Sequence, residues 1–466
     1  MQIYNTQSRR KEEFVPITPG KVGIYCCGPT VYNYFHIGNA RPFIVFDTLR
    51  RYFEYKGYEV TFVQNFTDID DKMIRRANEE GITVKELGER FIKEYYQDAD
   101  ALGVERASVN PKATEHIPEI IGIIQKLVEK GLAYACPNGD VYYDTQAFPS
   151  YGKLCGQNLE DLESGARIDV DPNKRHPMDF ALWKAQKPGE PAWESPWGMG
   201  RPGWHIECSA MSMKYLGETF DIHCGGKDLV FPHHENEIAQ SEGATGKPFV
   251  HYWMHNGFIN VDNQKMSKSL GNFFTVRDIS KEYDLEAVRM FMLSAHYRSP
   301  INFSRDLIEQ AKNALDRLYT AKDHYAFLLS HAEEKPADEK GLAIRAQIAK
   351  AKEAFESAMD DDLNTADALG AIFEMVRACN AEMNEETDRE TVKLALDTLL
   401  ELTAVCGILR RKEVEESDEV QKLAEARAKA RAEKNWAESD RLRDAIQALG
   451  YVVKDTKQGQ QITKAN

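Results

Sequence analysis

The sequence predicts an α/β fold in which a sheet domain is split by an insertion and followed by an α-helical region and a small C-terminal module. Three patterns support this prediction. An apolar run from Val22 to Cys26, a turn and a helical pattern form the opening half of a βαβ unit. A hairpin signal from Pro137 to Asp140 interrupts the sheet region. Beyond about Ser304 the apolar spacing is helical almost throughout.

The first strand and helix meet at a stretch that suits an anion. Gly28-Pro29 ends the strand, and after a short loop His36 opens the helix. In open α/β sheets ligands bind beyond the carboxyl ends of the strands, where a helix N-terminus offers unpaired N–H groups. We therefore expect a phosphate near His36 to Asn39, although so short a pattern also suits a capping histidine or an ordinary loop.

Size and charge limit the possible classes. The 466 residues suffice for roughly three domains. Apolar residues make up 42% of the chain and charged residues 29%, which argues against disorder. The formal net charge of −15, from 59 basic and 74 acidic residues, argues against non-specific coating of nucleic acid. It still allows a local basic surface that meets one RNA.

The compartment follows from two features. The N-terminus lacks the apolar segment of a secretory signal, and no apolar run reaches the length that spans a bilayer. The eight cysteines are scattered, which suits reduced thiols and metal ligands better than a disulfide framework. We expect a cytoplasmic protein that does not bind a membrane.

A second strand is predicted from Glu59 to Val63, and Thr67 just beyond it is expected to face a ligand. Asp70 and Asp71 suit the N-cap and first turn of a helix from Lys72 to Glu79. A ligand-facing role for the two carboxylates is the alternative.

We interpret residues from about Asn110 to Arg201 as an insertion between two halves of one sheet. Ile117 to Val128 has helical spacing that stops at Gly131, and a hairpin follows. The stretch from Trp193 to Gly203 is rich in glycine, proline and tryptophan and predicts a loop that returns toward the site.

The second half of the sheet region is rich in residues that ligate metals. Proline is well tolerated at the first position of a helix, so we predict that Pro232 starts a helix with His233 and Glu237 on one face. Further strands are predicted at Val250 to Trp253 and Phe258 to Val261.

The C-terminal part is predicted to be helical, with an acidic linker. A last helix from Asn435 to Leu449, with one apolar stripe, precedes a strand from Tyr451 to Lys454. The stripe consists of Trp436, Leu442, Ile446 and Leu449. The other helices and the linker are Leu342 to Met359, Ala366 to Met383, Val392 to Leu409 and the acidic stretch Glu413 to Glu419.

Four residues are candidates for a zinc site, since zinc takes cysteine, histidine and occasionally carboxylate ligands, usually four of them. They are Cys27, Cys208, His233 and Glu237. Two ambiguities stay open. Cys26 and Cys27 are adjacent on an extended segment and point to opposite faces, so only one is expected to reach the ion. His234 likewise neighbours His233, about 100° around the helix.

Two distant signatures indicate a family. His36-Ile37-Gly38-Asn39 and Lys265-Met266-Ser267-Lys268-Ser269 resemble the HIGH and KMSKS motifs of class I aminoacyl-tRNA synthetases, which bind ATP between two halves of a Rossmann-like fold. The chain is similar, over essentially its whole length, to the bacterial-type cysteinyl-tRNA synthetases. The runs that carry this similarity are C-G-P-T-V-Y, G-W-H-I-E-C-S-A-M, D-L-V-F-P-H-H-E-N-E and K-M-S-K-S-L-G-N-F. By this resemblance the zinc ligands are Cys27, Cys208, His233 and Glu237.

The resemblance implies a two-step reaction. The carboxylate of L-cysteine attacks the α-phosphorus of ATP to give cysteinyl-adenylate and pyrophosphate, and a terminal ribose hydroxyl of tRNA(Cys) then takes the cysteinyl group. Mg²⁺ would accompany ATP. One Zn²⁺ would bind the substrate thiolate, which is a far better zinc ligand than the hydroxyl of serine. No editing domain is then needed, and we expect a monomer.

The same resemblance assigns roles in ATP binding. His36 is expected to hydrogen-bond the phosphates, and Gly38 to let the adenine approach the backbone. Lys265 and Lys268 would stabilise the departing pyrophosphate. Asn39 replaces the second histidine of the HIGH pattern, and it can donate a hydrogen bond but cannot carry a proton. The ATP-binding set is completed by Met266, Ser267 and Ser269.

Four further positions match the amino-acid pocket of the family: Thr67, Trp204, His223 and Asp228. Trp204 also suits an ordinary core residue. For the anticodon, Arg431, Trp436 and Asp440 suit phosphate contact, base stacking and base-edge hydrogen bonding on one helix. Helix packing is the alternative for Trp436.

The expected domains follow from these assignments. The catalytic domain comprises residues 1–110 and 201–303, separated by the insertion 111–200. A helical tRNA-binding domain (304–410) and a linker with a small anticodon module (411–466) complete the chain.

Two other functions compete. Ligases that join cysteine to an amino sugar share the zinc, HIGH and KMSKS elements but lack a terminal anticodon module, so the tail from Asn435 to Lys454 argues against them. A zinc-containing RNA-binding paralogue without catalysis is disfavoured by Lys265 and Lys268.

Overall fold

The structure is a computed structural model that describes all residues except 158–171, 263, 266–272, 412–417, 457–458 and 465–466. The chain forms two compact units. The first comprises residues 1–308 and 357–366, and the second comprises 309–356 and 367–466. The predicted five-part division stays a prediction.

A parallel sheet forms the centre of the first unit, in the order β10-β9-β3-β4. Parallel bridges from Val63 to Val109 and from Phe66 to Lys112 add residues 109–112 beyond β4. In chain order the strands thus run 3-2-1-4-5, the doubly wound arrangement of nucleotide-binding folds. The strands are β3 (Lys21–Cys26), β4 (Glu59–Gln64), β9 (Phe220–Gly226) and β10 (Val250–Asn256), which confirms three predicted strands.

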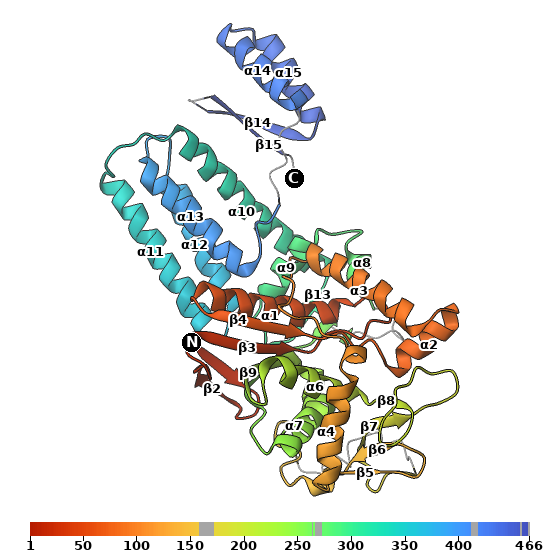
Figure 1. The fold of residues 1–466 in the computed structure, drawn as a ribbon. Helices are drawn as coiled ribbons and strands as arrows, with labels where there is room; N and C mark the ends of the chain where they lie inside the picture. The colour runs from red at the N-terminus through yellow and green to blue at the C-terminus, as the bar shows by residue number, and fades with distance from the viewer. Residues whose placement is uncertain (158–171, 263, 266–272, 412–417, 457–458, 465–466) are drawn as a thin grey trace. The chain divides into compact units, whose positions relative to one another are not determined.

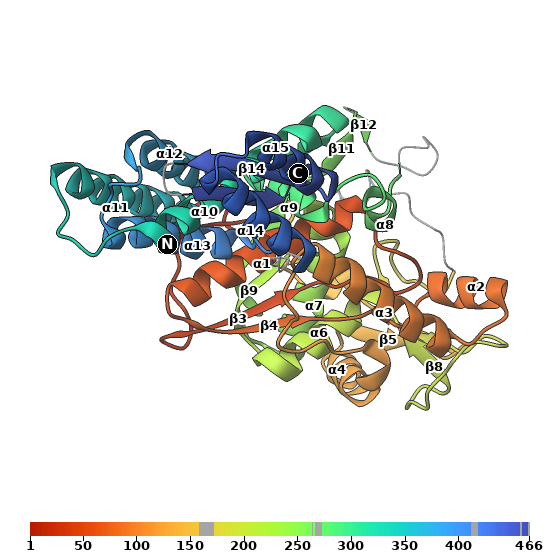
Figure 2. The same cartoon turned by 90° about the horizontal axis from the view of Figure 1, so that it is seen from above.

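Helices cover both faces of this sheet (Figures 1 and 2). Helix α1 (Ile37–Tyr55) packs on one face, against β4 and β9. Helix α6 (Trp204–Leu216) packs on the other, and α4 (Ile117–Glu129) and α7 (Glu235–Thr245) pack against it. Because both faces are covered, the strands are apolar and buried, with Tyr25 and Cys26 fully enclosed. The predicted helices at His36 and Ile117 are confirmed.

The insertion forms an antiparallel sheet in the order β5-β6-β7-β8. The predicted hairpin is confirmed as β5 (Ala133–Ala135) and β6 (Val141–Tyr143). Part of the expected loop at 193–203 is instead strand β8 (Gly200–Pro202), which pairs with β7 (Phe180–Ala185). Trp183 of β7 is fully buried in a large core of aliphatic and aromatic side chains, against which Trp193 and Trp197 also pack.

Helix α2 (Asp71–Glu80) begins as one of the two interpretations expected. The side chain of Asp70 caps it by accepting a hydrogen bond from the Lys72 N–H at 2.7 Å. Asp71 instead forms ion pairs with Lys184 at 2.8 Å and with the buried Arg201. The Asp71 carboxylate therefore joins α2 to strands β7 and β8 of the insertion.

Several elements were not predicted. Helix α3 (Val84–Ala101) starts with a capping box between Thr83 and Glu86, a sequence signal that could have revealed it. The N-terminal hairpin is made by β1 and β2, and the side chain of Asn5 donates to the carbonyl of His251 on the edge strand β10. The remaining elements of this unit are β1 (Gln2–Asn5), β2 (Arg10–Glu13), β11 (Ile259–Val261), β12 (Gln264–Lys265), β13 (Ile301–Phe303), α8 (Val276–Ile279) and α9 (Leu285–Leu293).

Helices dominate the C-terminal part, which confirms the predicted helical region. Its elements are α10 (Arg305–His331), α11 (Glu339–Asp360), α12 (Thr365–Glu382), α13 (Arg389–Cys406), α14 (Asp418–Ala432), α15 (Trp436–Ala448), β14 (Tyr451–Thr456) and β15 (Gly459–Lys464). Most of the acidic linker lies outside the described residues, but its end belongs to the unpredicted α14. None of the described helices is long and apolar enough to cross a membrane.

The predicted stripe of the last helix is only half correct. Leu442 and Ile446 are buried, and Ile446 forms a small core with Val420 and Tyr451. Trp436 is 57% exposed and Leu449 is 40% exposed, because they lie at the two ends of α15, beyond this core.

The turn between α11 and α12 belongs to the first unit. Asp362 is fully buried, and its carboxylate accepts hydrogen bonds from the Tyr4 N–H, the Tyr297 hydroxyl and the Arg298 guanidinium at 2.7 to 2.8 Å. Its φ is +62°, a left-handed conformation that Asp tolerates better than most residues. One carboxylate thus joins β1, the 296–298 segment and this turn.

We expect Asp362→Asn to lower the free energy of unfolding by about 2–3 kcal/mol, because Arg298 loses its buried counter-charge. Asparagine keeps the shape and tolerates the left-handed backbone. The control is Asp361→Asn, whose partner Lys11 is at the surface, so its effect should stay below about 1 kcal/mol. The measurement is the urea midpoint of each variant, and equal midpoints for both would contradict the expectation.

Candidate active site

The candidate site lies at the carboxyl ends of β3 and β9, where the strand order reverses. From β3 the chain continues through α1 to β4 on one side, and from β9 it continues through α7 to β10 on the other. The Cys27 N–H donates to the carbonyl of Cys224 at 3.3 Å, which holds the two strand ends together. Ligands of doubly wound sheets bind at this switch point.

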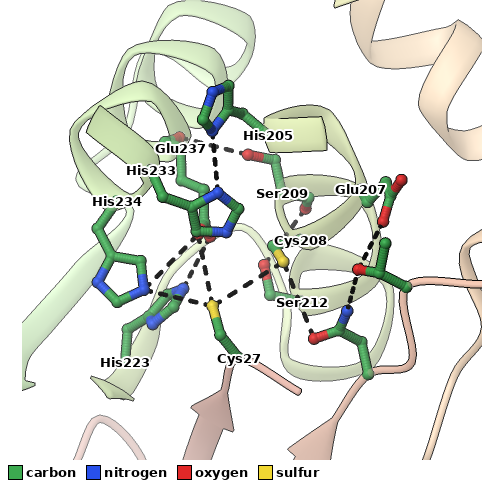
Figure 3. A network of polar contacts seen from close by, with 12 residues as sticks. Cys27, His205, Glu207, Cys208, Ser209, Ser212, His223, His233, His234 and Glu237 are labelled. Atoms are coloured by element: carbon green, nitrogen blue, oxygen red, sulfur yellow. Dashed lines mark hydrogen bonds and ion pairs between the residues drawn. The ribbon is translucent and has the colours of Figure 1, made fainter. Parts of the chain in front are cut away.

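Four predicted ligands meet there (Figure 3). One donor atom each from Cys27, Cys208, His233 and Glu237 lies within 4.8 Å of the others, so the group could hold a metal ion. The Cys27 Sγ is 3.9 Å from the Cys208 Sγ and 3.7 Å from the Glu237 Oε1. The His233 Nε2 is 3.1 Å from the same Oε1.

A second, overlapping group satisfies the same criterion. It consists of Cys27, His223, His234 and Glu237. The His234 Nε2 lies 3.3 Å from the Cys27 Sγ, and the His223 Nε2 lies 2.7 Å from the Glu237 Oε2. Geometry alone therefore does not separate His233 from His234. Cys27 belongs to both groups, whereas Cys26 is buried behind it near Gln64.

Glycine and asparagine shape the path of the chain past Cys27. A Cβ on Gly28 would lie 1.6 Å from the backbone oxygen of Asn65, so only glycine fits this close approach. The Asn65 Oδ1 accepts a hydrogen bond from the Gly28 N–H at 2.9 Å and also lies 3.9 Å from the Cys208 Sγ. Asn65 thus connects the segments that contain both cysteines.

The histidine side of the site follows the predicted local structure. The chain is kinked at the non-helical Phe231, and the helical residues from Pro232 run directly into α7 (Glu235–Thr245), so the predicted helix start at Pro232 is confirmed. His233 faces Glu237, as the i, i+4 spacing indicated. The Nδ1 of His233 is 2.9 Å from the Nδ1 of His205, and the centroid of its ring lies 4.4 Å from that of Trp204 in a tilted arrangement. These contacts orient the imidazole.

The charges of the cluster support one another. A hydrogen bond from Cys27 lowers the pKa of Cys208 to about 6. Burial lowers the pKa of His233, but Cys208 and Glu237 outweigh it and raise that pKa to about 10. Burial raises the pKa of Glu237, but His223 and His233 lower it to about 2. At neutral pH the metal-free cluster therefore contains a Cys208 thiolate and a Glu237 carboxylate beside a protonated His233, and the imidazole would lose its proton when a metal binds.

Two of the predicted amino-acid pocket residues, Trp204 and His223, contact this cluster. Thr67 is buried, and its hydroxyl donates to the Glu207 carboxylate at 2.9 Å. His223 is fully buried and stacks on Trp253 at 4.5 Å. Trp204 is 42% exposed and is therefore no core residue. Asp228 follows β9 in a short exposed 3₁₀ turn.

The segment that follows the second signature, Phe274 to Val276, lies beside the start of α1. His36 is the N-cap of α1, and its extended segment pairs with Thr275 in an antiparallel bridge. The Ile37 N–H donates to the Phe274 carbonyl, and the Val276 N–H donates to the Phe35 carbonyl, each at 3.1 Å. Gly38 and Asn39 form the first turn of α1, and Lys265 ends β12. Residues 266–269, with Met266, Ser267, Lys268 and Ser269, lie outside the described residues.

Sequence reasoning missed three polar residues of the site. Asn65 and Glu207 are described above, and Glu207 is a fully buried carboxylic acid whose pKa burial raises well above its usual value. The third is His255, whose Nε2 lies 2.8 Å from the Nδ1 of His234 and whose Nδ1 lies 2.8 Å from the Thr6 hydroxyl. No local pattern marks these residues, because their partners are distant in the sequence.

Comparison with known proteins identifies the family. A model described as "tRNA synthetases class I (C) catalytic domain" matches residues 13–313, more than half of the chain. The cysteine–tRNA ligase of Caldicellulosiruptor saccharolyticus is 58% identical over 467 residues, covering 100% of both chains. The chain belongs to the cysteine–tRNA ligase family. The family's cysteine–tRNA ligase of Clostridioides difficile is 57% identical and covers 98% of this chain and 99% of that protein.

Further matches cover the C-terminal part and the fold. A DALR domain model matches residues 354–410, and a cysteinyl-tRNA ligase anticodon binding domain model matches residues 414–462. A Mycobacterium tuberculosis methionyl-tRNA synthetase structure has a TM-score of 0.61 at 16% identity and covers 83% of this chain and 89% of its own. A leucyl-tRNA synthetase complex from Agrobacterium radiobacter has a TM-score of 0.61 at 12% sequence identity, and the match covers 85% of each chain. The predicted ligase family and class I fold are confirmed.

The three predicted anticodon residues do not share one helix, because Arg431 lies on α14 whereas Trp436 and Asp440 lie on α15. Trp436 begins α15, and the Arg431 guanidinium lies 5.7 Å from the centroid of its ring. Arg431 also pairs with Asp455 at 2.9 Å. Asp440, on the first half of α15, is 3.2 Å from Arg443. All three predicted residues fall within the matched anticodon binding domain.

We expect the metal-free protein to contain a Cys208 thiolate that forms with a midpoint near pH 6. A lowered pKa means that the anion exists above the midpoint and is protonated below it, whereas an ordinary thiol titrates near about 8.5. The ultraviolet thiolate band, followed against pH, measures this. The band near pH 6 should vanish in Cys208→Ser and shift to higher pH in Cys27→Ala, which loses the donated hydrogen bond. A midpoint at the ordinary value in the unaltered protein would contradict the expectation.

Proposed function

We propose that this chain joins L-cysteine to tRNA(Cys) at the expense of ATP, through a cysteinyl-adenylate, as a Zn²⁺-containing cytoplasmic monomer. The observation that carries the proposal is the cluster of two thiols, an imidazole and a carboxylate at the switch point, in a chain 58% identical to a cysteine–tRNA ligase. Class I synthetases of this kind need no nucleophilic side chain, because positioning and charge neutralisation suffice.

The donor set supports zinc. Two sulfurs at tetrahedral zinc lie about 3.8 Å apart, since Zn–S bonds are about 2.3 Å long, and the Cys27 and Cys208 sulfurs are 3.9 Å apart. Cys27, Cys208, His233 and Glu237 would hold the ion, with His205 orienting the imidazole. Bound zinc would ligate the thiolate of cysteine and keep it deprotonated. His234 is the alternative imidazole.

The pocket residues would then orient the rest of the amino acid. Trp204 and His223 contact the cluster, Thr67 contacts Glu207, and Asp228 is an exposed carboxylate just beyond β9 that would suit an ammonium group. This enclosure matters for selectivity. Packing alone separates near-isosteres such as cysteine and serine by only about 10- to 200-fold, so the thiolate–metal interaction must supply the rest.

The ATP would be held between the two signature segments. His36, Gly38 and Asn39 would bind the phosphates and adenine at the N-terminus of α1, with Mg²⁺ on the phosphates. Lys265 and Lys268 would neutralise the pyrophosphate as it departs. Their run would be completed by Met266, Ser267 and Ser269. The pairing of Phe35–Ile37 with Phe274–Val276 supports this arrangement, because it attaches the chain that follows the KMSKS-like run to the start of α1.

The anticodon module supports tRNA as the acceptor. Trp436 is exposed beside Arg431, which suits stacking of an unpaired base and contact with a phosphate, and Asp440 is available to a base edge. The match of an anticodon binding domain over residues 414–462 disfavours an amino-sugar acceptor. No observation favours a paralogue without catalysis.

Removal of the metal should abolish cysteine-dependent ATP–pyrophosphate exchange, and added Zn²⁺ should restore it. Zinc content should fall from about one ion per chain to near zero in Cys208→Ser, because a neutral hydroxyl is a poor ligand. Serine should support exchange at least about 10³-fold less efficiently than cysteine, beyond what packing provides.

The matched control is Cys136→Ser, a thiol of the insertion that belongs to neither ligand group. It should keep its zinc and its activity. Zinc content of His233→Ala and His234→Ala separates the two histidines, since only the true ligand should be essential. A chelated protein that still activated cysteine and rejected serine would refute the proposal.

Trp436→Ala should raise the KM for tRNA about 10- to 100-fold, because stacking of a base on an aromatic ring is worth about 1–3 kcal/mol. Exchange in the absence of tRNA should be unchanged. Leu449→Ala, at the other exposed end of α15, is the control and should leave both constants unaltered. An unchanged KM for tRNA in the tryptophan variant would remove this residue from the interface.

A further inference from the structure

Arg41 is a buried cation without a counter-charge. It lies on α1, five residues beyond His36, and is fully buried. In the part of the chain that the structure describes, no carboxylate lies within ion-pair distance of its guanidinium, and the Nε has no partner. Burying such a charge is unfavourable unless its hydrogen bonds compensate. The hydrogen bonds that the guanidinium does form must therefore offset the cost of burying it.

The acceptors are three backbone carbonyls at one corner of the fold. One terminal nitrogen donates to the carbonyls of Gly257 and Phe258 at 2.8 and 3.0 Å, and the other donates to that of His296 at 3.2 Å. Gly257 and Phe258 link β10 to β11, and His296 precedes β13, which pairs with β11. The guanidinium thus joins α1 to the start of both β11 and β13.

This corner lies at the N-terminal end of the segment that contains the KMSKS-like run. From Phe258 the chain passes through β11 to β12, which pairs with β11 and ends at Lys265. The position of the Lys265 backbone is therefore set, through two paired strands, by the corner that Arg41 holds. The corner is tightly packed, since a Cβ on Gly257 would lie 2.6 Å from the Ser299 carbonyl oxygen.

The C-terminal end of the same segment also pairs with the residues at the start of α1. Beyond the undescribed residues the chain returns at Phe274 to Val276, which pairs with Phe35 to Ile37. Both ends of the segment are thus attached to one stretch of seven residues, from Phe35 to Arg41. The attachment at Arg41 alone depends on a side chain.

We propose that Arg41 is a positioning residue for the ATP-dependent step, which holds the β10–β11 corner, and with it the backbone of Lys265, in register with the helix that starts at His36. This inference rests on the proposed function. Arginine suits the task because its planar fork reaches carbonyls from two separate segments, whereas a lysine ammonium is a point charge on a flexible stem. The residue touches neither substrate nor reacting atoms in this role.

The test compares Arg41→Met and Arg41→Lys with Arg289→Met in the full chain. Arg289 is an equally buried arginine that also contacts α1, through Asp47, but it lies on α9 and binds the carbonyls of Leu102 and Gly103. It therefore controls for the loss of a buried arginine beside the same helix. For each variant, Tm, zinc content, the KM for cysteine and the kcat of exchange are measured.

Arg41→Met should lower the kcat of exchange by about 100-fold, the cost of a displacement of about 1 Å at a reacting group. Its zinc content should be unchanged and its KM for cysteine should stay within about threefold, because the metal cluster lies on other strand ends. Arg41→Lys should be intermediate. Arg289→Met should lower Tm but leave the kcat within about threefold.

The proposal is overturned if Arg41→Met keeps its kcat, or if Arg289→Met loses as much kcat as Arg41→Met at a similar Tm, which would indicate a purely structural role. If Arg41→Met does not fold, Arg41→Lys decides in the same way: a lower kcat at an unchanged Tm supports positioning, and an unchanged kcat overturns it. If the unaltered protein catalyses no exchange, the proposed function fails and this inference fails with it. If the unaltered protein catalyses exchange and the Arg41 variants have the same kcat, this inference fails and the proposed function stands.

Discussion

The parallel pairing of β3 with β9 is the constraint on which the site depends. The strands are in register from Ile24 opposite Ile222 to Cys26 opposite Cys224, so their carboxyl ends meet at one edge. Because successive side chains of a strand point to opposite faces, a slip by one residue would turn Cys27 away and bring Cys26 to the cluster. Burial of both faces opposes such a slip. The identity of the sulfur in the cluster is thus a consequence of strand register.

Local patterns revealed the parts of the fold that depend on local forces. The strand before Gly28 and the helix after His36 were predictable because an apolar run, a breaker and a helical period follow one another directly. The spacing of His233 and Glu237 likewise indicated a shared face, and the helical turn that contains them begins at Pro232 as predicted, directly after the kink at Phe231. The same spacing did not separate His233 from His234, since both imidazoles reach the cluster.

The contacts that sequence reasoning missed connect residues far apart in the chain. His255 orients His234 and is itself held by Thr6, and Asn65 links the segments of both cysteines, yet none of these residues carries a local signal. Trp436 shows the opposite error, because its spacing suggested a buried stripe although α15 has too small a core to cover it. Periodicity indicates a face of a helix, but the size of the partner surface decides how much of that face is buried.

The turn at residues 357–366 has a consequence for how the protein is made. The ribosome releases the chain from its N-terminus, and the first 308 residues emerge without the carboxylate that receives the Tyr4 N–H, the Tyr297 hydroxyl and the Arg298 guanidinium. The nascent catalytic unit must therefore wait until α10 and α11 have been synthesised before its last buried partner arrives. A gene fragment that stops at Ile308 would encode that unit without Asp362, so the three groups that donate to its carboxylate would lack this acceptor.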